Sequence, residues 1–82
     1  MSEARKQEIK YKLEYLAQKV ANPETPYESG QIGFRTSFQE EADALKKYIE
    51  ELTWELVRNH NVVIKVGSGC GIVTVFVTRL KQ

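Results

Sequence analysis

The chain has 82 residues, a net charge of +1 and 41% hydrophobic residues. This length fits a single domain over residues 1–82, and the charge is too small for a polyanion mimic or a strongly basic nucleic-acid binder. A domain this short gains little stability from its own core and usually adds disulfides, a metal or an oligomer. Cys70 is the only cysteine and His60 the only histidine, so an intrachain disulfide and a Cys/His zinc site are both excluded. We therefore expect a homo-oligomer without a metal or another cofactor.

The composition also bears on location. No apolar run approaches the roughly 20 residues that a membrane span needs. Residues 1–12 are charged and lack the apolar centre of a signal peptide. A free thiol fits a reducing compartment. The sequence thus predicts a cytoplasmic protein that does not contact a membrane.

The first predicted element is a helix from about Glu3 to Val20, capped by Ser2. Its apolar face consists of residues at helical spacing, namely Ile9, Leu13, Leu16 and Val20. Asn22 and Pro23 end the helix, and the segment up to Gly30 is expected to be a linker with turns. The alternating stretch from Gln31 to Thr36 predicts a short strand.

The second predicted helix starts at Ser37, which stands three residues before Glu40 in a capping-box spacing. The helix runs to about Arg58. Its apolar stripe has the clearest periodicity in the chain and consists of Phe38, Ala42, Leu45, Ile49, Leu52 and Leu56.

After His60 the hydrophobic period changes to two. The segments Val62 to Val66 and Ile72 to Leu80 predict two strands of a hairpin, joined by a five-residue glycine-rich turn from Gly67 to Gly71. The element order is therefore α-β-α-β-β. The predicted fold class is α+β.

The topology follows from two constraints. A right-handed crossover through the second helix makes the first and second strands parallel. The last strand is antiparallel to its hairpin partner and apolar on both faces, which is typical of a central strand. We expect a mixed three-stranded sheet in the order 1-3-2, with two helices on one face.

Two helices cover only one face, so the other face needs a second cover. Val73, Val75 and Val77 would form an exposed apolar patch, which monomers rarely leave open. Copies that stack sheet on sheet, or pair their edges, would bury it. The alternative is a three-layer monomer in which the first helix crosses to the other face. Trp54 lies off the helical stripe and is a second candidate for an interface.

The glycine-rich turn is the candidate ligand site. Successive backbone N–H groups in such a turn can form a nest that holds an anion. The turn joins two strands and contains no lysine, so it is not a nucleotide-binding P-loop. An ordinary hairpin turn is the alternative reading. Because His60 lies at the opposite end of the hairpin from the turn, the cations of this site are expected to come from a neighbouring copy. The predicted ligand-binding residues are Gly67, Ser68, Gly69, Cys70, Gly71, Arg35, Arg58, His60, Lys65 and Arg79.

No catalytic group is predicted. Cys70 lies at the tip of the hairpin and His60 at its base, about 16 Å away along the strand, too far for an intrachain Cys-His pair. A reactive centre needs a nucleophile, a base and an orienting group, and these cannot be assembled from a single histidine and a single cysteine. The chain is therefore expected not to be an enzyme.

The segment from Thr36 to Ala42, followed by helix, strand, turn and strand, is similar in element order to dodecin-type flavin-binding oligomers. The N-terminal helix and the short hairpin turn depart from that order. The resemblance therefore implies no flavin site and no site residue in this chain.

Three functions remain. The first is a small, non-enzymatic, self-associating regulatory or interaction protein that binds another macromolecule. The second is an oligomer that binds or sequesters a small anionic ligand such as a nucleotide. The third is nucleic-acid binding, for which the basic residues near Tyr11 and Tyr15 are a weak indication.

Overall fold

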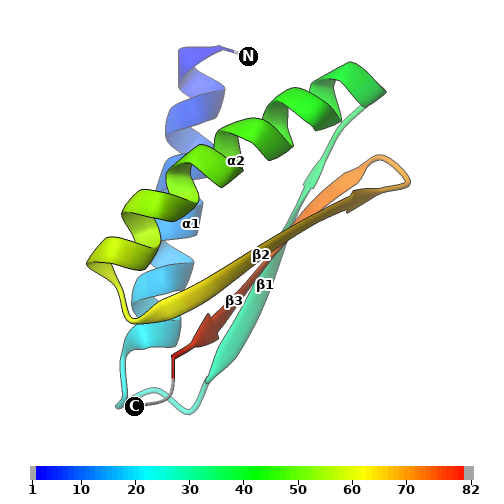
Figure 1. Ribbon diagram of the computed structural model, residues 1–82. Coiled ribbons are helices and arrows are strands. Elements are labelled where there is room, and N and C mark those ends of the chain that lie inside the picture. The colour runs from blue at the N-terminus through cyan, green and yellow to red at the C-terminus, as the bar shows by residue number, and fades with distance from the viewer. Residues whose placement is uncertain (1, 81–82) are drawn as a thin grey trace.

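The structure is a computed structural model and describes residues 2–80 (Figure 1). Along the chain lie five elements: α1 (Glu3–Ala21), β1 (Ser29–Arg35), α2 (Gln39–Asn59), β2 (Val62–Gly69) and β3 (Ile72–Arg79). The predicted α-β-α-β-β order and the α+β class are confirmed. Within residues 2–80, neither helix combines the length and the apolar character that crossing a membrane requires.

Helix α1 begins as the sequence predicts. The side chain of Ser2 accepts a hydrogen bond from the backbone N–H of Arg5 at 3.2 Å. At the other end the N–H of Asn22 donates to the carbonyl of Gln18, and Pro23 follows. The buried face of α1 consists of Ile9, Leu13, Ala17 and Val20.

Helix α2 begins one residue later than predicted. Phe38, not Ser37, is the N-cap, and its side chain makes no capping hydrogen bond. The carboxylate of Glu41 instead accepts the N–H of Ser37 at 3.2 Å, which satisfies a donor just before the helix. As a result Phe38 is exposed rather than part of the stripe. The other predicted stripe residues are buried, namely Ala42, Leu45, Ile49, Leu52 and Leu56.

The sheet has the predicted order β1-β3-β2. Strand β3 is antiparallel to both neighbours, with Ile32 opposite Val75 on one side and Val66 opposite Val75 on the other. The sheet is therefore wholly antiparallel, and the prediction of a mixed sheet is wrong. The reason is geometric: β1 and β2 run in the same direction, but β3 lies between them, so the two parallel strands are never neighbours.

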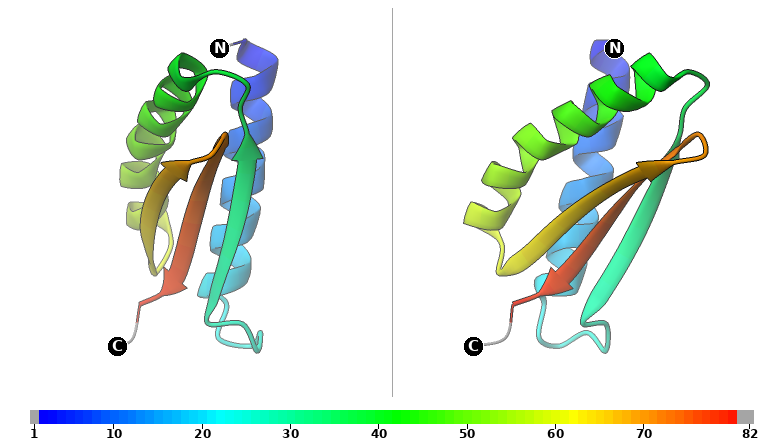
Figure 2. Two further views of the ribbon diagram at one scale, coloured as in Figure 1. Left: turned by 90° about the vertical axis from the view of Figure 1, so that its right-hand side faces the viewer. Right: turned by 45° about the vertical axis from the view of Figure 1, so that its right-hand side comes forward.

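Both helices lie on one side of the sheet (Figure 2). Helix α2 packs mainly on β2, and α1 packs on β3 and β1. The valines of the central strand, Val73, Val75 and Val77, lie beneath the helices and are at most 1% exposed. This corrects the predicted interface, because the valine row is the covered row and the opposite row of β3 faces outward.

The hairpin turn is shorter than predicted. Gly69 pairs with Ile72, so the strands extend into the glycine-rich segment and leave only Cys70 and Gly71 as the turn. Both residues have positive φ, 52° and 77° respectively. That combination is typical of a type I′ turn, whose twist matches that of the flanking strands.

Candidate functional site: the open face of the sheet

The side of the sheet away from the helices is hereafter called the open face. Side chains alternate along a strand, so each strand contributes every second residue to it. The strand registers and burial pattern assign to the open face Ser29, Gln31, Gly33 and Arg35 of β1, Ile72, Thr74, Phe76 and Thr78 of β3, and Val63, Lys65, Gly67 and Gly69 of β2.

An aromatic ring stands at the centre of the open face. Phe76 on the central strand is 45% exposed, although it sits in the middle of a sheet. Gln31 lies directly opposite it on β1, and Lys65 lies opposite it on β2. Side chains in such directly opposed positions have Cβ atoms about 5 Å apart. An amide, an aromatic ring and an ammonium group therefore form one row across the three strands.

A shallow hollow of about 390 Å³ borders the Phe76 ring on the β1 side. It is lined by Ser29, Gly30, Gln31, Phe76 and Thr78. Its wall combines ring carbons with hydroxyl and amide groups. A planar group with a polar edge can therefore contact both kinds of atom there.

The next row across the open face, beside that of Phe76, contains two glycines and so has few side-chain atoms. Gly33 and Gly67 are both opposite Thr74, one on each side. A Cβ atom on Gly33 would meet the side chain of Ile72 at 3.3 Å, so the glycine lets Ile72 lie across β1. At Gly67 nothing lies within 4 Å of the Cβ position. The floor beside the Phe76 ring is consequently open toward β2.

The charge distribution of the chain is asymmetric between the two layers. All acidic residues lie on the helices or in the linker between α1 and β1, whereas the strands carry only Arg35, Lys65 and Arg79 as charged residues. Arg35 and Lys65 are on the open face. On α1, by contrast, Glu3 and Glu8 are paired with basic residues, and a 2.9 Å hydrogen bond from Lys12 lowers the pKa of the Glu8 carboxyl. The open face is thus positively charged with no acid on it.

The predicted ligand-binding residues are divided between several places. Arg35, Lys65, Gly67 and Gly69 belong to the open face. Arg58 and His60 lie at the α2–β2 connection, at the opposite end of β2 from the turn. Within one chain Arg35 lies at the turn end of the sheet, since Arg35 and Gly69 are both opposite Ile72, whereas Arg58 and His60 lie at the other end.

Arg79 has a different environment from the other cations. Its side chain points toward the helix layer, where Nε donates to the carbonyl of Val20 at 2.7 Å. Its Nη2 atom lies 2.7 Å from the carbonyl oxygen of Asn22 and 2.8 Å from that of Tyr27. These bonds hold the end of α1 and the following linker against β3. The guanidinium is therefore a structural clamp rather than part of a ligand site.

The predicted anion nest requires free N–H groups in the glycine-rich segment. The N–H of Leu80 donates to the carbonyl of Asn61, so the backbone groups of the odd-numbered residues of β2 point toward β3 and those of the even-numbered residues point away. By this alternation the backbone groups of Gly67 and Gly69 point toward β3, into the ladder. Those donors are therefore committed to the sheet.

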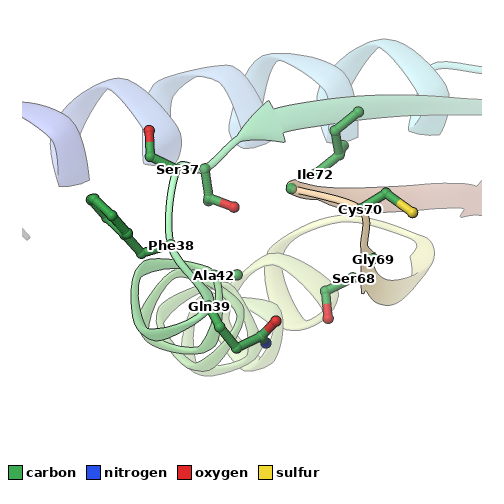
Figure 3. Close-up of a pocket in the computed structure, with 10 residues that line it drawn as sticks. Ser37, Phe38, Gln39, Ala42, Ser68, Gly69, Cys70 and Ile72 are labelled. Carbon is green, nitrogen blue, oxygen red and sulfur yellow. The ribbon is translucent and has the colours of Figure 1, made fainter.

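A second hollow, of about 210 Å³, lies between the hairpin turn and the start of α2 (Figure 3). Ser68 at the end of β2 and Cys70 in the turn border it on one side, and Ser37 and Gln39 border it on the side of α2. Cys70 is exposed, and its sulfur points away from Phe38 in this view. His60 is at the far end of β2, as predicted. Among residues 2–80, no group of His, Cys, Asp and Glu is arranged to hold a metal ion.

Trp54 is on the outer surface of α2 and is 78% exposed. Val57, one helical turn further on, is also exposed. The two side chains form an apolar patch on the helix layer, on the other side of the molecule from Phe76. Trp54 is therefore accessible to a partner, and its role at an interface stays a prediction.

Sequence reasoning missed Phe76 and Gln31. A signal for the open face was present in β3, where Phe76 stands between Thr74 and Thr78 while the alternate row is uniformly valine. Hydroxyl side chains on one row and valines on the other are typical of a strand with one wet face.

Comparison of the chain with protein-family models, with curated proteins and with solved structures finds no match.

Proposed function

We propose that this protein binds single-stranded nucleic acid on the open face of its sheet, as a non-enzymatic macromolecule-binding module. The observation that carries the proposal is the row Gln31–Phe76–Lys65, centred on an exposed ring and set in a face without acids. Single-stranded nucleic acids bind to proteins by stacking bases on aromatic rings and by contacts between cations and phosphates.

Each side chain of the row has a role. Phe76 provides a surface on which one base stacks. Gln31 offers both donors and an acceptor to the edge of that base. Lys65 stands on the opposite side of the ring, where its ammonium group meets the phosphate backbone, and Arg35 adds a second cation at the end of β1.

The same charges argue against stacking of two copies through their open faces. A sheet-on-sheet dimer would bring Arg35 and Lys65 of both copies into one contact, with no carboxylate to pair them. Buried charges without partners cost several kcal/mol. An anionic partner is favoured over a second copy on this face for that reason.

The direct test is fluorescence anisotropy with a labelled single-stranded oligonucleotide at about 50 mM salt. We expect dissociation constants of about 1–100 µM, the range of non-specific electrostatic binding. Raising the salt concentration should weaken binding, because counterions compete for the phosphates. A duplex of the same sequence should bind less well, since its bases are stacked inside the helix.

Two results would contradict the proposal. One is the absence of any anisotropy change at about 100 µM protein and low salt, well within the usual non-specific range. The other is equal affinity for a mononucleotide and for the oligonucleotide. Equal affinity would favour a small anionic ligand, because a single nucleotide cannot contact Lys65, Phe76 and Arg35 together with several phosphates.

A further inference from the structure

The outer edge of β1 has unpaired backbone groups. The carbonyl of Glu28 accepts from the N–H of Arg79 at 2.7 Å, and the N–H of Thr36 donates to the carbonyl of Gly71 at 2.8 Å. Both hydrogen bonds are to β3 or its turn, so the backbone N–H and C=O groups of the even-numbered residues of β1 point toward β3. The odd-numbered residues therefore direct their N–H and C=O groups away from the sheet; they are Ser29, Gln31, Gly33 and Arg35.

Nothing in β1 protects this edge. Proteins usually shield an edge strand with lysines, prolines or a bulge. Strand β1 has seven residues in continuous register with β3, contains no proline, and has one charged residue, Arg35, at its end. Such an edge is a template for pairing with another strand.

An apolar groove runs beside the same edge. It has a volume of about 280 Å³ and lies between α1 and β1. Its lining residues are Tyr11, Lys12, Tyr15, Leu16, Gln31 and Ile32. Tyr11 is 71% exposed and Tyr15 59% exposed, although both adjoin the core residue row of α1. A strand added to β1 would place side chains against these rings.

We propose that a second copy of this chain pairs its β1 strand antiparallel to this one, about a two-fold axis at Ile32. In this register Ser29 of each copy faces Arg35 of the other, and Gln31 faces Gly33. Each residue whose backbone N–H and C=O groups point outward is then opposite another such residue, and the pairing extends over the whole of β1. The tyrosines and Ile32 of the two copies meet above the seam, and the two sheets become one sheet of six strands.

The apolar groove selects this orientation. Ile32 lines the groove, and antiparallel pairing about a two-fold axis through Ile32, normal to the sheet, keeps α1 of both copies on the same side, so the two grooves adjoin. A two-fold axis along the strands would pair them in parallel and would put the two α1 helices on opposite sides of the joined sheet. The proposal does not depend on nucleic-acid binding, although it would join two open faces into one surface.

Sedimentation velocity at micromolar concentrations, without nucleic acid, tests the proposal. We expect a species of twice the 9.4 kDa chain mass. The substitution Gln31→Pro removes an outward N–H and no bond to β3, so it should leave the folded monomer and weaken the dimer at least about tenfold, by ~1.4 kcal/mol. Gln31→Thr is the matched control, because it keeps the N–H and should leave the dimer unchanged.

Two further changes keep the test decisive if the proline variant does not fold. Tyr15→Glu puts a charge into the groove at an exposed site and should also give monomers, whereas Trp54→Glu on α2 should not. A monomeric wild-type protein at about 100 µM would overturn the proposal, since specific homodimers associate well below that concentration. A dimer that survives Gln31→Pro and Tyr15→Glu would overturn it as well.

Discussion

The guanidinium of Arg79, at the end of β3, donates a 2.7 Å hydrogen bond to the carbonyl of Val20, in the last turn of α1. The last carbonyls of a helix have no partner within the helix, so an outside donor is needed to satisfy them. Arg79 thereby ties the first helix to the strand that is furthest from it in the sequence.

Replacing Arg79 should destabilise the fold. In Arg79→Met the carbonyls of Val20, Asn22 and Tyr27 lose a charged donor, and we expect a loss of about 2–3 kcal/mol in the free energy of unfolding. Arg79→Lys should lose less, because a lysine keeps the charge but cannot fork between these carbonyls. Urea denaturation measures both values. Arg58→Met, at an exposed site, is the control, and an equal loss there would contradict the role of the clamp.

The two turn residues should respond in opposite directions. Asn is favoured over Cys at the first position of a type I′ turn, so Cys70→Asn should raise the free energy of unfolding by about 0.5–1 kcal/mol. Gly71→Ala should lower it by about 1–3 kcal/mol, because φ is 77° there and the new Cβ would lie 3.2 Å from the carbonyl oxygen of Thr36. Thermal unfolding detects both, at roughly 4–8 °C per kcal/mol in a domain of this size. Shifts of the same sign would argue against this turn type.

The covered and open faces of the sheet can be distinguished with two neighbouring residues. Val75→Thr places a hydroxyl at a fully buried position and should cost about 1–3 kcal/mol. Thr74→Val is the reverse substitution on the open face, and it should change the free energy of unfolding by no more than about 0.5 kcal/mol. Chemical denaturation of the two variants side by side measures the difference. A larger loss for Thr74→Val would mean that the helices cover the other row.

Removing the ring of Phe76 tests base stacking. Stacking on an aromatic side chain contributes about 1–3 kcal/mol per base, so Phe76→Ala should weaken oligonucleotide binding roughly 5- to 150-fold. Trp54→Ala removes a larger, more exposed ring from α2 and should leave the affinity unchanged. Anisotropy titrations of the two variants under identical salt give the comparison. A stronger effect at Trp54 would move the binding surface to the helix layer.

The two open-face cations should control the salt dependence. Each phosphate contact on a single strand contributes about 0.7 to the slope of log K against log salt concentration. Lys65→Gln and Arg35→Gln should therefore each reduce the slope by about that amount. Lys47→Gln on α2 serves as the control for a change in net charge alone. An unchanged slope in both open-face variants would show that phosphates are bound elsewhere.

Most of the fold could be predicted from periodicity, because hydrophobic spacing reports directly on burial. The stripe from Ala42 to Leu56 and the alternation after Val62 gave the elements, and the doubly apolar last strand gave the order 1-3-2. One error concerned the whole sheet, because a central β3 antiparallel to β2 is antiparallel to β1 as well, which rules out a mixed sheet. Another was local. The start of α2 moved by one residue because the Glu41 carboxylate, rather than the Ser37 hydroxyl, satisfied the free donor.

The candidate site was harder to predict, because it depends on which row of β3 the helices cover. Val75 and Phe76 are both apolar, and the one signal that separates their rows is the pair of threonines that flank Phe76, Thr74 and Thr78. The role of Arg79 was also hidden, since its acceptors are backbone carbonyls far away along the chain. Backbone acceptors have no signature in a sequence.

The place of β3 in the sheet constrains how the protein is made. This strand is the partner of both others, yet it is the last of the three to leave the ribosome. Until β3 is made, β1 and β2 in the nascent chain have no strand to pair with. The apolar faces of the two helices likewise have little to pack on. Exposed strands of this kind are prone to aggregate. Translation that stops before β3 therefore yields a product for proteases and chaperones rather than a partly folded domain.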